Sequence, residues 1–90
     1  MRKFDLGKIV ATPGALAALE ASGQSPAFFL DQHIQGNWGE VGAEDKRAND
    51  DALISGERLL SAYKTLKGER LWIITEADRS STTILKPEEY

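Results

Sequence analysis

Cysteine is absent from this 90-residue chain, and histidine occurs once. Without cysteine the chain forms no disulfide, no thiolate nucleophile and no cysteine-bound metal site, and this absence fits a reducing cytoplasm. A zinc site would need carboxylates for all its ligands but one, so we expect no bound metal. The glycine-rich motifs of nucleotide-binding loops are also missing, and we therefore expect no cofactor.

Long apolar runs are absent as well. The apolar runs, such as residues 15–19 and 71–74, are far too short to cross a membrane. The N-terminal residues lack the apolar region of a secretory signal. We therefore expect a cytoplasmic protein with no membrane partner.

A large charge of either sign is missing too. The chain carries 11 basic and 14 acidic residues, a net charge of −3, without the strong basic surplus of a general nucleic-acid binder. Residues 1–57 hold five basic and nine acidic residues, whereas residues 58–90 hold six and five. With 41% hydrophobic and 28% charged residues the chain has the composition of a folded protein, and its length predicts a single domain over residues 1–90.

Helical and extended patterns follow one another in the order β-α-α-α-β-β-β, which predicts an α+β fold. Three helices are expected to begin at Thr12-Pro13, at Ser25-Pro26 and near residue 44, and each is followed by a glycine that ends it. Alternating apolar residues predict strands at residues 4–11, 58–65, 70–76 and 81–86.

The strands should form one antiparallel sheet with a C-terminal three-stranded meander and the helices packed on one face. Leu71 and Ile73 share one face of the middle strand while Trp72 and Ile74 share the other, so this strand should be central and covered on both sides. The expected core consists of Leu16, Leu19, Phe29, Leu30, Leu60, Leu71, Ile73 and Ile84.

His33 lies on the apolar side of the second expected helix. A histidine there can be a half-buried residue whose ring is satisfied by backbone or solvent. It can also be a general acid or base, because its ordinary pKa lies near neutrality. Both interpretations stay open.

Trp38 stands between two loop-forming residues, Asn37 and Gly39. A tryptophan in this setting is either a lid over the core or an anchor for a binding partner. Arg79 lies in the most polar stretch, residues 75–83. This composition is typical either of a hydroxyl-rich turn or of a phosphate-binding site in which the Arg79 guanidinium donates two hydrogen bonds to the phosphate. As a turn residue at the surface, Arg79 is expected to change stability by no more than about 0.5 kcal/mol.

Several motifs together carry a resemblance. They are His33-x-x-Gly36-Asn37-Trp38-Gly39, Asn49, Gly56-x-Arg58-Leu59-Leu60-Ser61-x-Tyr63, Trp72-Ile73-Ile74-Thr75-Glu76-Ala77-Asp78-Arg79-Ser80-x-Thr82-Thr83 and Pro87-Glu88-Glu89-Tyr90. With these motifs the chain resembles a family of small uncharacterised bacterial proteins associated with plasmids and other mobile elements, some of which carry restriction-related names. The resemblance covers almost the whole chain and implies no particular activity.

A second likeness is architectural. Helices followed by an antiparallel sheet with one histidine are similar to small metal-independent ribonucleases of the toxin type. This likeness implies His33 as acid or base and Arg79 as the group that stabilises phosphate charge. Ser61, Tyr63 or Thr82 would then position an RNA substrate.

Two hypotheses follow. The first is a small non-enzymatic interaction or regulatory protein of a mobile element, whose partner is another protein bound through Trp38 and Arg79. The second is a metal-independent ribonuclease, which requires His33 and Arg79 to open into one cleft.

Overall fold

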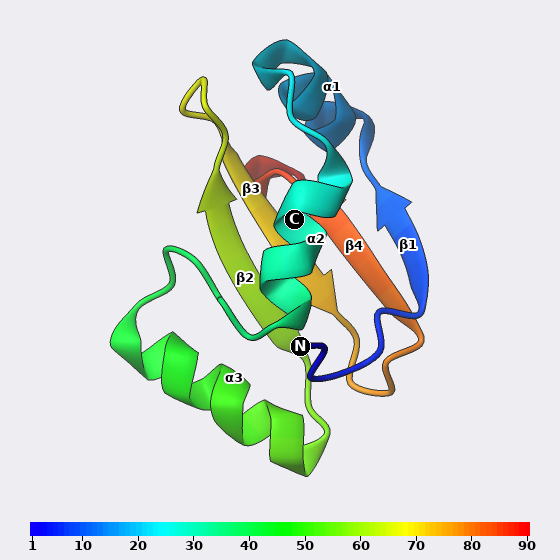
Figure 1. Cartoon of the computed structure of the whole chain (residues 1–90), viewed down its shortest axis with the longest axis vertical. Coiled ribbons are helices and arrows are strands. Elements are labelled where there is room, and N and C mark those ends of the chain that lie inside the picture. The colour runs from blue at the N-terminus through cyan, green and yellow to red at the C-terminus, as the bar shows by residue number, and fades with distance from the viewer.

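Four strands form one mixed sheet in the order β1-β4-β3-β2, in a computed structural model that describes all 90 residues (Figure 1). Three helices and four strands follow one another in the predicted order, and a short 3-10 turn that the sequence pattern did not predict comes after β4. The elements are β1 (Lys8–Ala11), α1 (Pro13–Ser22), α2 (Pro26–Ile34), α3 (Ala43–Ser55), β2 (Leu59–Lys64), β3 (Arg70–Thr75), β4 (Ser81–Leu85) and η1 (Pro87–Glu89).

The C-terminal strands pair as a meander, with β2 antiparallel to β3 and β3 antiparallel to β4. The prediction of an antiparallel sheet is wrong for β1, which pairs parallel with β4. A hairpin makes the two strands it joins antiparallel. β1 and β4 are not joined by a hairpin, because three helices and two strands lie between them along the chain. An alternating apolar pattern carries no information on direction, so the sequence could not decide it.

The first strand is also shorter than predicted, because Lys3 is bonded to the end of α2 and the chain reaches the sheet only near Leu6, whose carbonyl accepts from the Thr82 hydroxyl. The backbone N–H of Lys3 donates to the Ile34 carbonyl over 2.8 Å. Gly7 then turns the chain with φ +65°, and a Cβ at this position would collide with the Ser80 carbonyl. Only a glycine allows this close approach, and strand pairing begins directly after it at Lys8.

The helix-covered face of the sheet holds the main core, against which α1 and α2 pack (Figure 1). Its buried residues are Ala15, Ala18, Leu19, Phe29, Leu30, Tyr63, Leu71, Ile73 and Ile84. Six of the predicted core residues are buried, namely Leu19, Phe29, Leu30, Leu71, Ile73 and Ile84.

Two predicted core residues lie elsewhere. Leu16 is 49% exposed, because α1 approaches the sheet through the stripe formed by Ala15, Ala18 and Leu19. Leu60 is only partly buried, because its neighbours Leu59 and Ser61 face the core and alternation turns Leu60 to the opposite side of the sheet.

We call this opposite side the outer face. The register places on it Lys8 and Val10 of β1, Leu60, Ala62 and Lys64 of β2, Arg70, Trp72 and Ile74 of β3, and Ser81, Thr83 and Leu85 of β4. Arg58 just before β2 and Glu76 just after β3 extend the same face, where their side chains form an ion pair. The middle strand was predicted to be covered on both sides. On the outer face its cover comes from the C-terminal residues, where the ring of Tyr90 contacts Trp72 at 5.6 Å.

The exposed edge of β2 is closed by groups from outside the sheet. The side-chain amide of Asn49 on α3 donates to the Leu60 carbonyl and accepts from the Leu60 N–H, at 2.7 and 3.1 Å. Further along, the Ala62 N–H donates to the Trp38 carbonyl and the Ala62 carbonyl accepts from the Glu40 N–H. An unpaired edge would template pairing with another chain, so these contacts protect the sheet on this side. No helix of the structure is long and apolar enough to span a membrane.

Candidate functional site

His33 lies on the buried side of α2 and has no exposed surface. Its Nδ1 is 2.5 Å from the Ser61 hydroxyl, and its Nε2 is 2.9 Å from the Thr75 hydroxyl. Thr75 in turn contacts the Thr82 hydroxyl at 2.8 Å, and Thr82 donates to the Leu6 carbonyl at 2.7 Å. The ring nitrogens are therefore satisfied by side-chain hydroxyls, where the sequence analysis expected backbone or solvent.

The direction of every proton in this chain of hydrogen bonds follows from its last member. Thr82 has a single hydroxyl proton, which it gives to a carbonyl, so it accepts from Thr75. Thr75 has then used its own proton and accepts from Nε2–H of His33. Ser61 is left to donate to Nδ1. The network thus fixes a neutral His33 with its proton on Nε2.

Burial keeps His33 neutral. It lowers the pKa of the imidazole from 6.5 to about 4, because the charged form would lose its hydration. The surrounding rings of Phe4 and Trp38, with centroids at 5.1 and 5.7 Å, offer no compensating charge. In this position the ring joins α2 to β2 and β3 and does not reach a solvent-borne substrate.

Arg79 and His33 do not open into a shared cleft. Both contact the ring of Phe4, His33 at 5.1 Å between ring centroids and the Arg79 guanidinium at 5.8 Å. Neither lines any of the hollows on the surface. The other residues implied by the ribonuclease likeness are also built into the interior: Ser61 and Thr82 are fully buried, and Tyr63 donates its hydroxyl to the Asn37 carbonyl over 2.5 Å. Burial raises the pKa of Tyr63 to about 12.

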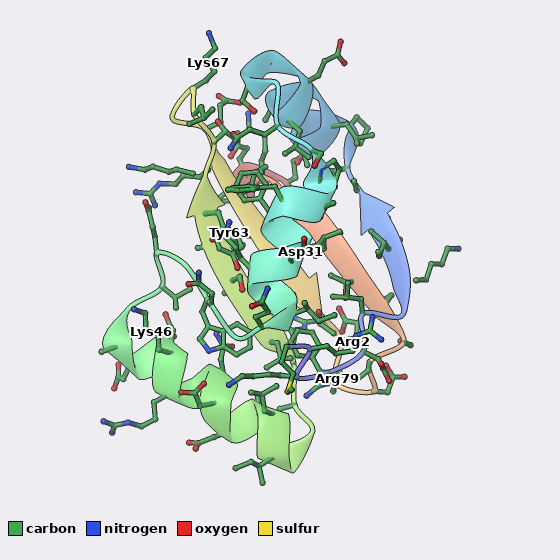
Figure 2. The ribbon with its side chains drawn as sticks, in the orientation of Figure 1. Arg2, Asp31, Lys46, Tyr63, Lys67 and Arg79 are labelled. Carbon is green, nitrogen blue, oxygen red and sulfur yellow. The ribbon has the colours of Figure 1, made fainter.

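Figure 2 labels the Arg79 side chain. Its guanidinium donates to backbone carbonyls near the C-terminal end of α3. One terminal nitrogen donates to the carbonyls of Glu57, Glu76 and Ala77, and the other donates to the carbonyl of Ala52 over 3.0 Å. The negative end of the helix dipole lies at the C-terminal end of α3, so a cation there is favourable. Arg79 therefore clamps the end of α3 to the β3–β4 turn, and its donors are not free for a phosphate.

Replacement of Arg79 by alanine is expected to lower the free energy of unfolding by about 1–2 kcal/mol, since it leaves several carbonyls without their charged donor. Arg79→Lys should recover only part of this loss, because the single nitrogen of an ammonium group cannot donate to all the carbonyls that the two terminal nitrogens of the guanidinium reach. Denaturant unfolding measures both variants. A change of less than about 0.5 kcal/mol in Arg79→Ala would instead match the surface residue expected from the sequence.

Trp38 is 3% exposed and lies in a second core cluster with Ala52 and Leu59. Its indole N–H donates to the Asp50 carboxylate over 3.1 Å. The position is that of a lid over the core, and the side chain presents almost no surface with which to anchor a partner. The acidic side chains around Asp50 lie on the exposed side of α3, and no three acidic or histidine side chains gather as metal ligands.

The outer face has a hollow of about 160 Å³, lined by Arg58, Ile74, Glu76, Thr83, Leu85 and Tyr90. Arg58 forms one wall, where it donates to the Tyr90 hydroxyl over 2.9 Å and pairs with Glu76 at 3.3 Å. This site was missed in the sequence analysis. The sequence pattern that indicates this site is the alternation along β3, which places Trp72 and Ile74 on the same side of the strand. That pattern was interpreted only as a sign that this side of the strand is buried.

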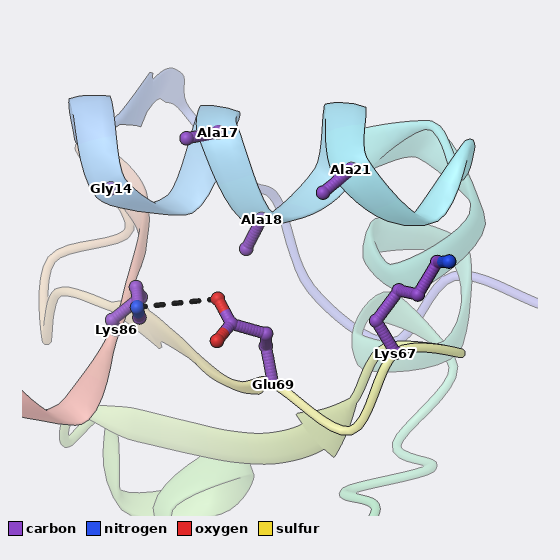
Figure 3. A pocket seen from close by; sticks show the side chains of 7 residues that line it. All are labelled: Gly14, Ala17, Ala18, Ala21, Lys67, Glu69 and Lys86. Atoms are coloured by element: carbon purple, nitrogen blue, oxygen red, sulfur yellow. Dashed lines mark ion pairs between the residues drawn. The ribbon is translucent and has the colours of Figure 1, made fainter.

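A larger hollow of about 580 Å³ lies under α1 and contains Lys67, Glu69 and Lys86 (Figure 3). The Lys86 ammonium is paired with Glu69 at 3.2 Å and with Glu88 at 3.1 Å. The nearby N-terminus of α1 is also occupied, because the Glu89 carboxylate accepts from the Gly14 N–H and the Thr12 hydroxyl. The charges of this region thus serve mainly to hold the C-terminal residues in place.

Comparison of the chain with protein-family models, with curated proteins and with solved structures gives no match.

Proposed function

We propose that this protein is a small non-enzymatic binding domain that holds a macromolecular partner on the outer face of its sheet. The observation that carries the proposal is the composition of that face. Apolar side chains run across its centre, and Trp72, Tyr90 and Arg58 lie together there. Tryptophan, tyrosine and arginine are the residues that most often supply binding energy at interfaces.

The size of the hollow supports a partner that spreads over the face. A volume of about 160 Å³ is below the roughly 300–1,000 Å³ of ordinary small-molecule sites. It accommodates one side chain or one ring of a larger ligand. The role of His33 supports the non-enzymatic part, because both ring nitrogens bind buried hydroxyls. The association with mobile elements and the cytoplasmic location belong to the same proposal. The class of the partner, for which the sequence predicted another protein, is decided by the experiment below.

A photo-crosslinking residue on the outer face tests the proposal. With p-benzoylphenylalanine at Thr83, irradiation of bacterial cells that produce the protein should yield a discrete crosslinked product. The same residue at Asp51, on the exposed side of α3, provides the matched control and should give none. The melting temperature of each variant must remain close to that of the wild type.

Treatment of the product with nuclease then identifies the class of the partner, because nuclease shortens a crosslinked nucleic acid and leaves a crosslinked protein unchanged. Absence of any product at Thr83, or equal products at Thr83 and Asp51, would contradict binding by the outer face. The ribonuclease hypothesis gains no support from the structure, since it requires a cleft shared by His33 and Arg79.

A further inference from the structure

The outer face is basic although the chain is acidic. It carries four basic side chains, Lys8, Arg58, Lys64 and Arg70, and one acidic side chain, Glu76. The whole chain has 11 basic and 14 acidic residues, so the remaining surface carries the negative charge. The average over the chain therefore hides a local surplus of cations on one side of the sheet.

The two acidic residues of the adjacent 3-10 turn do not cancel this surplus. Glu88 pairs with Lys86 at 3.1 Å, and the Glu89 carboxylate accepts hydrogen bonds at the N-terminus of α1. Both carboxylates are thus bound to groups outside the outer face. The cations of this face border the apolar centre at both ends, because Arg58 lies before β2 while Lys64 and Arg70 pair at the other end of the hairpin.

Aromatic rings occupy the centre between these cations. Trp72 on β3 is partly exposed, and the ring of Tyr90 lies against it at 5.6 Å with an interplanar angle of 68°. Tyr90 is 71% exposed, so its ring presents surface to solvent. Rings on a sheet surface offer flat platforms on which unpaired bases stack.

We propose that the outer face binds single-stranded nucleic acid, with bases stacked on Trp72 and Tyr90 and phosphates paired with Lys64 and Arg70. This inference rests on the proposed function and names its partner. Neighbouring residues on one face of a strand are about 7 Å apart, so Arg70 and Trp72 lie one such step apart along β3 and can contact the phosphate and the base of one extended strand.

Single strands suit this face better than the alternatives. In a duplex the bases are stacked on each other, and their flat sides are closed to the protein. The basic side chains of this face outnumber the acidic ones by four to one, which matches the uniformly negative backbone of a nucleic acid. Stacking and phosphate pairing do not involve the sugar, so DNA and RNA strands should bind alike.

Fluorescence anisotropy with labelled oligothymidylate and oligouridylate of about 20 nucleotides measures the binding at low salt. Trp72→Leu keeps an apolar side chain but removes the aromatic ring, and it should weaken affinity by about 5- to 150-fold. Trp72→Phe retains a ring and should remain within about 3-fold of the wild type. Thermal melting checks that each variant is folded.

Charge reversal provides a second, independent measurement. Arg70→Glu should weaken binding and reduce the dependence of log affinity on log salt by about 0.7 for each phosphate that no longer pairs with the protein. Arg47→Glu on α3 introduces the same change of charge away from the outer face, and it should leave both quantities near wild type. Both arginines are exposed, so neither substitution should disturb the core.

Three results would overturn the inference. These are absence of binding to either oligonucleotide, duplex binding as tight as single-strand binding, and equal losses in Arg70→Glu and Arg47→Glu. A crosslinked product at Thr83 that nuclease leaves unchanged would overturn it as well, but would leave the proposed function intact. Absence of any crosslink at Thr83 would contradict the proposed function itself.

Discussion

Replacing Trp38 with alanine is expected to lower the free energy of unfolding by about 3–5 kcal/mol. The indole is almost completely buried, stacks on Phe4 at 6.2 Å and donates a hydrogen bond to Asp50. Removal of the ring leaves a cavity between α3 and β2 and an unpaired carboxylate partner. Small domains have unfolding free energies of only about 5–15 kcal/mol, so the loss is a large fraction of the total.

Circular dichroism during heating measures this effect. For a domain of this size the loss should lower the melting temperature by more than about 12 °C. Phe28→Ala is the matched control, because it removes an aromatic ring that is 54% exposed and should have a much smaller effect. If Trp38→Ala kept the wild-type melting temperature and lost partner binding, Trp38 would be the anchor that one interpretation of the sequence described.

Acidification from pH 6.5 to 4 should cost the protein about 3 kcal/mol through His33 alone. Burial lowers the pKa of this residue from 6.5 to about 4 in the folded state, while in the unfolded chain it returns to the ordinary value. Below pH 6.5 the unfolded chain therefore binds a proton that the folded protein does not. The stabilising contribution is complete above pH 6.5 and is lost as the pH falls towards 4.

Denaturant unfolding at a series of pH values isolates this contribution when the wild type is compared with His33→Gln. Glutamine is neutral throughout and offers both a donor and an acceptor to the hydroxyls of Ser61 and Thr75. Carboxylates titrate equally in both proteins, so the difference between the two curves reports His33. A difference that stayed constant between pH 6.5 and 4 would show that the imidazole titrates normally in the folded protein.

The meander could be predicted well from the sequence because its signals are local. The predicted strands at residues 58–65, 70–76 and 81–86 agree within one residue with β2, β3 and β4. The helix ends could be predicted equally well, since the Thr12 hydroxyl caps α1 and Gly56 ends α3 with φ +78°. The parallel pairing of β1 with β4 depends on a contact between residues about 70 positions apart, and no local pattern encodes it.

The candidate sites were less predictable, because residue type does not reveal surroundings. Arg79 sits in a turn with φ +60°, yet its side chain turns inward to carbonyls that come from other segments. His33 has the spacing of a helix residue at the core edge, but the hydroxyls that bind it come from β2 and β3. The outer face was within reach, since its basic and aromatic positions follow directly from the alternation along residues 58–64 and 70–76.

The closed edge of β2 limits how copies of this chain can assemble. The Lys8 and Thr12 N–H groups point toward β4, so alternation turns the backbone groups of Ile9 and Ala11 outward, and β1 is the one edge of the sheet without cover. A fibril that grows by strand addition needs two available edges on every chain. Here Asn49 and the segment around Gly39 occupy the second edge, so strand addition at β1 ends with a pair of chains and cannot propagate.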